Sequence, residues 1–108
     1  MLPKKNRADK KAVEKIFREG KFFSFSNLIF KFYLEKTAKP PKISIIAPKN
    51  VAKLAVKRNK LRRLGYQVLG KYINQFPLGL CGVLIFKKYQ DDVTIIENEI
   101  KNTLYKIN

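Results

Sequence analysis

Hydrophobic residues recur along the chain at two spacings, one typical of helices and one typical of strands. Residues 10–19 carry apolar side chains at i, i+3 and i+4, which predicts a short helix with Asp9 as its N-cap and Gly20 at its end. Residues 28–35 alternate with period two, which predicts a strand with one core face and one mixed face. The core face holds Leu28, Phe30, Phe32 and Leu34, and the mixed face holds Ile29, Lys31, Tyr33 and Glu35.

Three further segments complete the predicted sheet. Residues 21–25 predict a shorter strand that precedes a turn at Ser26 and Asn27. Two adjacent prolines at 40–41 mark a loop, since proline cannot continue a strand in the middle of a sheet. The segments ISIIA (43–47) and GVLIFKK (82–88) predict two buried strands.

The longest predicted helix runs from about Asn50, shortly after Pro48, to about Asn74. Gly65 lies in its middle, where glycine costs about 1 kcal/mol relative to alanine and therefore indicates close packing or a bend. A last helix is predicted after Asp91 and Asp92, whose negative charge suits a helix N-terminus. The apolar side of the long helix comprises Val51, Leu54, Ala55, Leu61, Leu64, Val68, Leu69 and Tyr72, and that of the last helix Val93, Ile96, Ile100, Leu104 and Ile107.

The charge of the chain predicts a binding function, which the hydrophobic pattern alone does not. The chain has 24 Lys or Arg against 8 Asp or Glu, a net charge of +16, and no acidic residue lies between Lys36 and Gln90. We expect these central cations to lack carboxylate partners within the chain. Like charges one turn apart destabilise a helix, so a polyanion should compensate them, nucleic acid first and an anionic membrane surface second. The densest cluster comprises Arg58, Asn59, Lys60, Arg62 and Arg63.

Several kinds of chemistry are disfavoured by what the chain lacks. It has no histidine, which excludes a hydrolase built on a Ser-His or Cys-His pair. Cys81 is the single cysteine, so it forms no intrachain disulfide and no zinc cluster, and we expect it to be a small buried residue. The start of the chain lacks the apolar core of a signal peptide, and no apolar run reaches the ~20 residues of a membrane span. These features predict a cytoplasmic protein of one domain, residues 1–108.

The cationic cluster has the chemistry that a phosphate backbone requires. Arginine offers a planar fork for phosphate oxygens and keeps its charge, and Asn59 could hold a base edge, a ribose hydroxyl or a metal-bound water. On the mixed face of the strand, Lys31 and Tyr33 could clamp and stack single-stranded nucleic acid together with nearby aromatic residues.

One stretch of the long helix resembles a known family. Residues 55–63, AVKRNKLRR, are similar to the pattern A-V-x-R-N-x-[IVL]-K-R of the bacterial ribonuclease P protein component. The upstream PKISIIAPKNV, the N-terminal LPKKNRADKKAVEKIFREGK and the final GVLIFKK with its helix extend the resemblance over nearly the whole chain. The chain departs from the family at Tyr66, where Arg is frequent, at Ser44, where the middle strand has Gly, and at Val13, where Phe is usual.

The resemblance implies an α+β sandwich of order αβββαβα, similar to the second domain of ribosomal protein S5. Its four-stranded sheet contains a left-handed βαβ crossover, an exception to the general right-handed rule. The implied function is that of a non-catalytic subunit of an endonuclease, which removes the 5′ leader from precursor tRNA. The RNA subunit carries the active site with Mg²⁺, and the protein itself binds no cofactor, no membrane and no small-molecule substrate.

The resemblance also assigns residues to two RNA partners. The catalytic RNA should dock on the long helix and the loop before it, and the single-stranded leader should lie in a cleft between the sheet and the first helix. The residues expected to bind the catalytic RNA are Lys49, Lys53, Arg58, Asn59, Lys60, Arg62, Arg63 and Tyr66, and those expected to bind the leader are Phe17, Lys31, Tyr33 and Ser44.

Three alternatives share some of these features. A basic ribosomal-type RNA-binding protein without a processing role would have the same charge. A self-sufficient nuclease would need a metal site, for which Asp91 and Asp92 are the candidates, although helix N-terminal acids are the simpler interpretation. A membrane-surface binder would use the long helix as an amphipathic anchor, but the aromatic residues are not concentrated on that helix.

Overall fold

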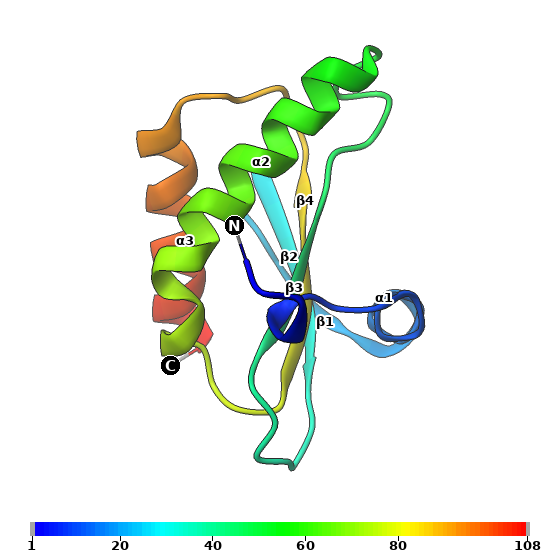
Figure 1. Cartoon of the computed structure of the whole chain (residues 1–108), viewed down its shortest axis with the longest axis vertical. Coiled ribbons are helices and arrows are strands. Elements are labelled where there is room, and N and C mark those ends of the chain that lie inside the picture. Colours follow the sequence, from blue (N-terminus) through cyan, green and yellow to red (C-terminus); the bar gives the residue numbers. More distant parts are fainter. Residues whose placement is uncertain (1, 108) are drawn as a thin grey trace.

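The computed structural model describes residues 2–107 and shows one sheet with helices on both of its faces (Figure 1). The helices are α1 (Lys10–Glu19), α2 (Ala55–Tyr72) and α3 (Val93–Ile107), with short 3₁₀ turns η1 (Lys4–Asn6) and η2 (Ile73–Gln75). The strands are β1 (Lys21–Ser24), β2 (Leu28–Leu34), β3 (Lys42–Ile46) and β4 (Leu80–Phe86).

The strands lie in the order β1-β2-β4-β3, which places the last strand of the sequence inside the sheet. β2 is antiparallel to both β1 and β4, whereas β3 runs parallel to β4, and α2 makes the crossover between these two. Phe30 is paired with Leu84 across the centre of the sheet, and Ser44 with Val83. The α+β class and the element order predicted from the sequence are therefore confirmed, while the hand of the crossover stays a prediction.

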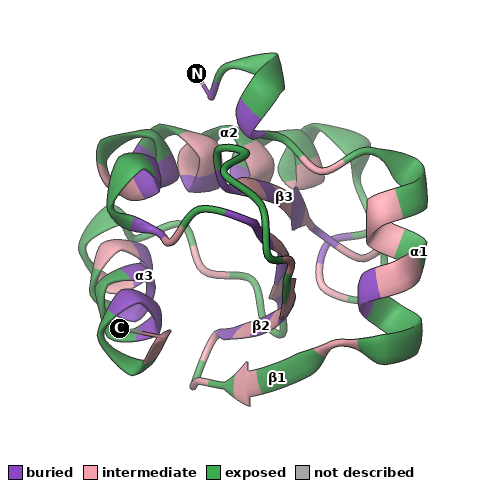
Figure 2. Ribbon diagram, turned by 90° about the horizontal axis from the view of Figure 1, so that it is seen from below, coloured by how far each residue is buried: buried purple, intermediate pink, exposed green. Residues whose placement is uncertain are grey.

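The two faces of the sheet are covered unequally. Figure 2 shows α3 on one side of the strands and α1 on the other, with α2 passing across the β3 end of the sheet. The large core lies on the α2 and α3 side, where Phe30, Ile43 and Leu84 are buried. On the opposite side, α1 buries Ile16 against the sheet. The second layer is shorter, and part of the sheet beneath it stays open.

The first helix has the predicted ends. The carboxylate of Asp9 accepts a hydrogen bond from the backbone N–H of Ala12 at 2.8 Å, which satisfies one of the free donors of the first turn. The N–H of Gly20 closes the last turn by donating to the carbonyl of Ile16 at 2.8 Å. The turn after β1 also lies where it was predicted, at Ser26 and Asn27.

The predicted start of the long helix is wrong. α2 begins at Ala55, five residues after Asn50, because residues 49–54 form a turn in which the carbonyl of Pro48 accepts from two backbone N–H groups. Leu54 is 64% exposed and Ala55 is also exposed, although helical spacing placed both on the apolar side. The first turns of α2 extend beyond the sheet, so they have no core to face (Figure 1).

Further along, α2 packs closely on the edge of the sheet, as Gly65 predicted. A Cβ atom added to Gly65 would lie 2.4 Å from the Cδ1 atom of Ile45 on β3. The helix therefore approaches the strand at a point where no other residue fits without displacing Ile45. Leu34 and Val93 are exposed despite their apolar spacing, since each lies at the end of its element.

A buried carboxylate that sequence reasoning missed connects α3 to the sheet. Glu99 accepts hydrogen bonds from the backbone N–H groups of Asn27 and Leu28, each at 3.0 Å. It also accepts from the side-chain amide of Asn27 at 2.6 Å. The turn between β1 and β2 is thereby held against α3, 72 positions away in the sequence.

Candidate nucleic-acid interface

The first turns of α2 carry an arginine that shapes the loop before the helix. One nitrogen of the Arg58 guanidinium donates to the carbonyl of Ala52 at 3.0 Å and to that of Lys53 at 2.8 Å. Leu54, the N-cap residue, contributes no side-chain hydrogen bond. Arg58 therefore holds the chain at the entry to α2 while its charge has no carboxylate partner within residues 2–107.

The next turn places an amide and two more arginines on the surface. Arg62 donates to the side-chain oxygen of Asn59, its neighbour one turn earlier. Arg63 is exposed. Within the part of the chain that the structure describes, neither Arg62 nor Arg63 forms an ion pair. The helix thus presents guanidinium groups whose charge is not neutralised by the protein.

The expectation that the central cations lack a partner is wrong for Lys60. Its ammonium lies 3.1 Å from a carboxylate oxygen of Asp91, in the loop before α3. The hydrogen bond with Asp91 raises the pKa of Lys60, and the same bond lowers the pKa of Asp91. The acid-free stretch ends at Gln90, one residue before the partner, and the fold brings that partner back to α2.

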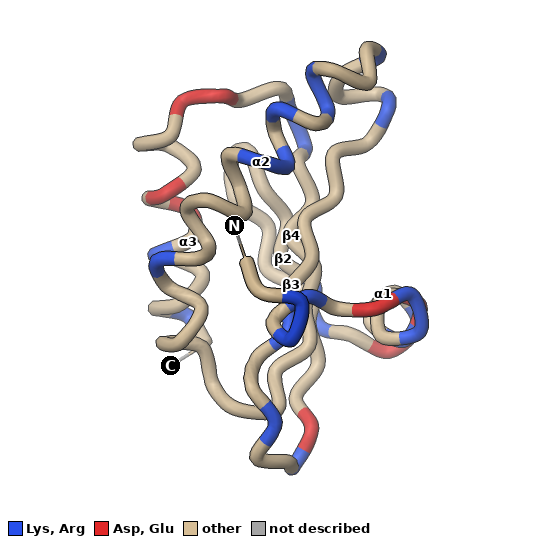
Figure 3. The backbone as a smooth tube through the Cα atoms, viewed as in Figure 1, with Lys and Arg blue, Asp and Glu red and all other residues tan. Residues whose placement is uncertain are grey.

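Tyr66 lies one helical turn beyond Arg62, at the sheet edge. Its hydroxyl accepts the backbone N–H of Ile45 at 3.1 Å, a donor that the edge strand β3 cannot use in the sheet. The guanidinium carbon of Arg7 lies 6.0 Å from the centre of the Tyr66 ring. Lys49 and Lys53 are exposed in the loop that precedes α2. Figure 3 shows Lys and Arg along the first half of α2 and along the chain before α1.

Three of the four predicted leader residues meet between α1 and β2. The ammonium of Lys31 lies 4.9 Å from the centre of the Phe17 ring, and Phe17 is 48% exposed. The ammonium of Lys15 lies 4.7 Å from the centre of the Tyr33 ring. Each aromatic ring therefore faces a cation, which is an attractive arrangement.

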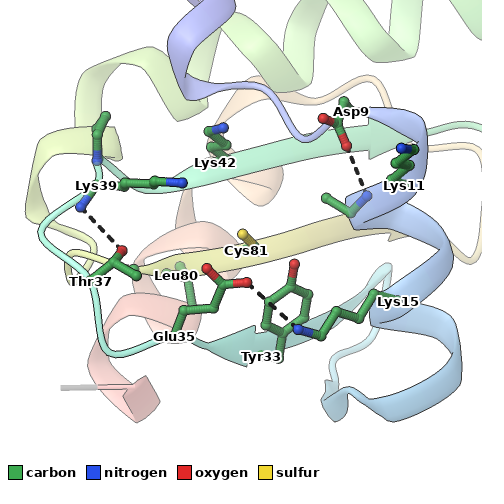
Figure 4. Close-up of a pocket in the computed structure, with 13 residues that line it drawn as sticks. Asp9, Lys11, Lys15, Tyr33, Glu35, Thr37, Lys39, Lys42, Leu80 and Cys81 are labelled. Carbon is green, nitrogen blue, oxygen red and sulfur yellow. Dashed lines mark hydrogen bonds and ion pairs between the residues drawn. The ribbon is translucent and has the colours of Figure 1, made fainter.

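A hollow of about 240 Å³ lies beside Tyr33, between α1 and the sheet (Figure 4). In Figure 4 the Tyr33 hydroxyl points into this space above β4. Lysines gather around it, and one of them, Lys15, pairs with Glu35 at 3.6 Å. The basic residues that line the hollow are Lys11, Lys15, Lys39 and Lys42.

Partial burial, and next a hydrogen bond with Cys81, raise the pKa of the Tyr33 phenol well above its usual range. The hydroxyl therefore stays protonated and can donate a hydrogen bond at any physiological pH. Cys81 itself is half-buried at the floor of the hollow rather than fully buried, so the sequence expectation for it is wrong. The strand alternation explains this position, because Cys81 is directly paired with Tyr33.

The fourth predicted leader residue, Ser44, has a different setting. Its hydroxyl donates to the carbonyl of Ala8 at 2.8 Å, which holds the segment before α1 against β3. Ser44 does not line the hollow at Tyr33 but borders an adjoining groove together with Tyr66. Sequence reasoning missed Lys42, which lines both sites, although its spacing of two from Ser44 places the two side chains on one face.

Two kinds of site are absent from the part of the chain that the structure describes. No group of three or more His, Cys, Asp or Glu residues within 2–107 could hold a metal ion. In the same range, none of the helices combines the length and the apolar character that crossing a membrane requires.

Comparisons with known proteins agree on one family. The family model described as Ribonuclease P matches residues 2–108. The chain is similar to the solved RNase P protein from Thermotoga maritima, with 21% identity, a TM-score of 0.81 and coverage of 94% of this chain and 97% of that one. It is also similar to the Staphylococcus aureus RNase P protein, with 18% identity, a TM-score of 0.79 and coverage of 95% and 98%. No curated protein matches the chain.

Proposed function

The chain belongs to the ribonuclease P protein family, and we propose that it is the subunit that binds both the catalytic RNA and the 5′ leader of precursor tRNA. In this proposal the RNA subunit carries the active site with Mg²⁺, and the protein promotes removal of the leader by positioning its partners. The complex acts in the cytoplasm on newly made tRNA precursors.

The catalytic RNA docks on the flank of α2. The observation that carries this assignment is that Arg58, Arg62 and Arg63 have no carboxylate partner within residues 2–107. Guanidinium forks bind phosphate oxygens in pairs and release counterions from the RNA as they do so. Asn59, held by Arg62, adds a side-chain amide to the same surface, and Lys49 and Lys53 extend it into the preceding loop. Lys60 contributes less, because Asp91 already neutralises it.

The leader lies between α1 and β2. Phe17 and Tyr33 present rings on which unpaired bases can stack, at about 1–3 kcal/mol per base. Lys15 and Lys31 lie over those rings and supply positive charge for the backbone. The protonated Tyr33 hydroxyl offers one hydrogen-bond donor in the hollow. A single strand fits this chemistry, since its bases are free to leave the stack.

The acids that a self-sufficient nuclease would need are already engaged. Asp91 pairs with Lys60, and Asp92 accepts the backbone N–H of Thr94 at 2.9 Å at the start of α3. This supports a non-catalytic subunit, as does a sequence without histidine.

Reconstitution tests the proposal. The purified protein should raise precursor-tRNA cleavage by a bacterial ribonuclease P RNA at low Mg²⁺, where the RNA alone is slow. A basic ribosomal-type protein would bind RNA without raising cleavage, so a matched preparation of such a protein is the control. Absence of stimulation with the cognate RNA would refute the processing role. Cleavage by the purified protein alone with divalent metal would favour the nuclease.

A further inference from the structure

The chain before α1 is fixed across the edge of the sheet. Residues 2–9, here called the N-terminal strap, are anchored at three points. Leu2 is 1% exposed and belongs to the core, and Asn6, which is 3% exposed, donates its side-chain amide to the carbonyl of Pro41 at 2.9 Å. The carbonyl of Ala8 accepts the Ser44 hydroxyl at 2.8 Å. The strap therefore has a defined position over β3, although only η1 within it is regular.

A groove of about 510 Å³ lies between the strap, β3 and α2. Its basic residues are Lys4 and Arg7 from the strap and Lys42 from β3, and Tyr66 of α2 lies at its other side. None of these three cations forms an ion pair within residues 2–107. The one acid in the groove, Asp9, is engaged in capping α1. The groove therefore carries net positive charge that the protein does not neutralise.

This groove adjoins the hollow at Tyr33. Lys42 and Asp9 line both spaces, so one continuous surface leads from Tyr33 past Lys42 to Tyr66. Figure 4 shows Lys42 on β3, between the hollow and the chain that descends into α1. Arg58 and Arg63, in contrast, line neither space. The groove thus adjoins the leader site.

We propose that the strap groove binds the phosphodiester backbone of leader nucleotides that extend beyond the hollow at Tyr33. This inference rests on the proposed function and adds a second subsite to it. Lys4 and Lys42 supply point charges for phosphate oxygens, and Arg7 supplies a planar fork that the Tyr66 ring supports from one side. Binding here is independent of base identity, because backbone contacts carry no sequence information.

Leader length provides the test. Precursor tRNAs whose leaders are lengthened one nucleotide at a time are bound to the reconstituted holoenzyme containing wild-type protein or the double variant Lys4→Ala/Arg7→Ala. We expect wild-type affinity to rise with leader length until the groove is filled. The double variant should lose about tenfold in affinity for the long leaders, with a salt slope lower by about one for each lost phosphate contact. With the shortest leaders it should match the wild type.

Two further variants make this test specific. Lys5→Ala removes a charge from the same strap but does not line the groove, so it should behave like the wild type at every leader length. Asn6→Ala keeps every charge yet releases the strap from Pro41, so it should reproduce part of the long-leader loss.

Two outcomes would overturn the inference. If the double variant lost affinity equally for long leaders, short leaders and mature tRNA, the groove would bind another part of the complex and not the leader. Unchanged binding by the double variant would show that the groove holds no RNA, and stimulation of cleavage by the wild type would leave the proposed function intact.

Discussion

The two faces of strand β2 show how one sheet supports both stability and binding. On the α2 and α3 side, Phe30 is fully buried, and its ring stacks on Phe32 with centroids 5.3 Å apart. On the α1 side, Lys31 and Tyr33 alternate with these residues and are only half-buried. Two helices close the first face, whereas one short helix covers part of the second (Figure 2). The open face exists because its covering layer is too small to fill it.

The partners of the aromatic rings differ in the same way. On the closed face the rings contact other rings, as Phe30 does with Phe76 at 6.1 Å between centroids. At the margin of this face, Phe23 contacts Phe32 and also faces the ammonium of Lys106. On the open face, the rings of Phe17 and Tyr33 each face a lysine ammonium group. A ring that is buried among other rings contributes to the core, while an exposed ring such as that of Phe17 can still accept a base.

The largest effect should come from breaking the closed face. Phe30→Ala should lower the free energy of unfolding by about 3–5 kcal/mol, because it leaves a cavity in a packed core. Tyr33→Ala, three residues along the same strand, should cost much less, since its ring is half-exposed. Urea denaturation of both variants measures the difference. Equal losses would contradict the division between a stabilising face and a binding face.

Removing the carboxylate that anchors α3 to the β1–β2 turn should have the next largest effect on stability. Glu99→Ala leaves the backbone N–H groups of Asn27 and Leu28 without their acceptor, which should cost about 2–3 kcal/mol of unfolding free energy. Glu14→Ala, an exposed carboxylate on α1, is the matched control and should change stability by less than about 0.5 kcal/mol. If Glu99→Ala also lowered the unfolding free energy by less than about 0.5 kcal/mol, water would have replaced the carboxylate as the acceptor.

On the open face, Tyr33→Ala should weaken binding of precursor tRNA about tenfold, within the range expected for one lost base stack. Mature tRNA lacks the leader, so its binding should be unchanged. Tyr105→Ala removes an aromatic ring that is 87% exposed on α3 and should affect neither RNA. Equal weakening of precursor and mature tRNA by Tyr33→Ala would remove this residue from the leader site.

Substitutions on the flank of α2 should change the salt dependence of RNA binding. Arg58→Ala and Arg62→Ala should each lower the slope of log affinity against log salt by about one. Arg58→Ala should in addition speed amide exchange in residues 49–54, because its bonds to Ala52 and Lys53 hold that loop. Unchanged slopes would mean that these side chains do not contact phosphate.

The smallest expected effect is a gain in RNA affinity. Asp91→Asn removes the carboxylate beside α2 and frees Lys60, so RNA affinity and the salt slope should both rise slightly. Lys60 lowers the pKa of Asp91, so the ion pair is present above the usual carboxyl range and is lost as pH falls through the lowered value. The variant and the wild type should therefore converge in acid. Weaker RNA binding by Asp91→Asn at neutral pH would contradict this account.

The sequence alone determined the elements whose causes are local. Helical spacing predicted α1 with Asp9 and Gly20 at its ends, and period-two alternation predicted the two faces of β2. Hydrogen bonds within a helix and alternation along a strand depend on neighbours a few positions away, so the chain order contains them. The cationic flank of α2 could also be read from the order of residues, because the cations follow one another at helical spacing within a single segment.

Tertiary structure decided whatever depends on residues far apart in the chain. The ion pair between Lys60 and Asp91 spans 31 positions, and the strap anchor between Asn6 and Pro41 spans 35. Spacing also placed Leu54 in the core, but α2 begins later and its first turns pass beyond the sheet. Burial, pairing and the shape of a groove depend on which segments the fold brings together. The periodicity of one segment carries no information about which other segment will pack against it.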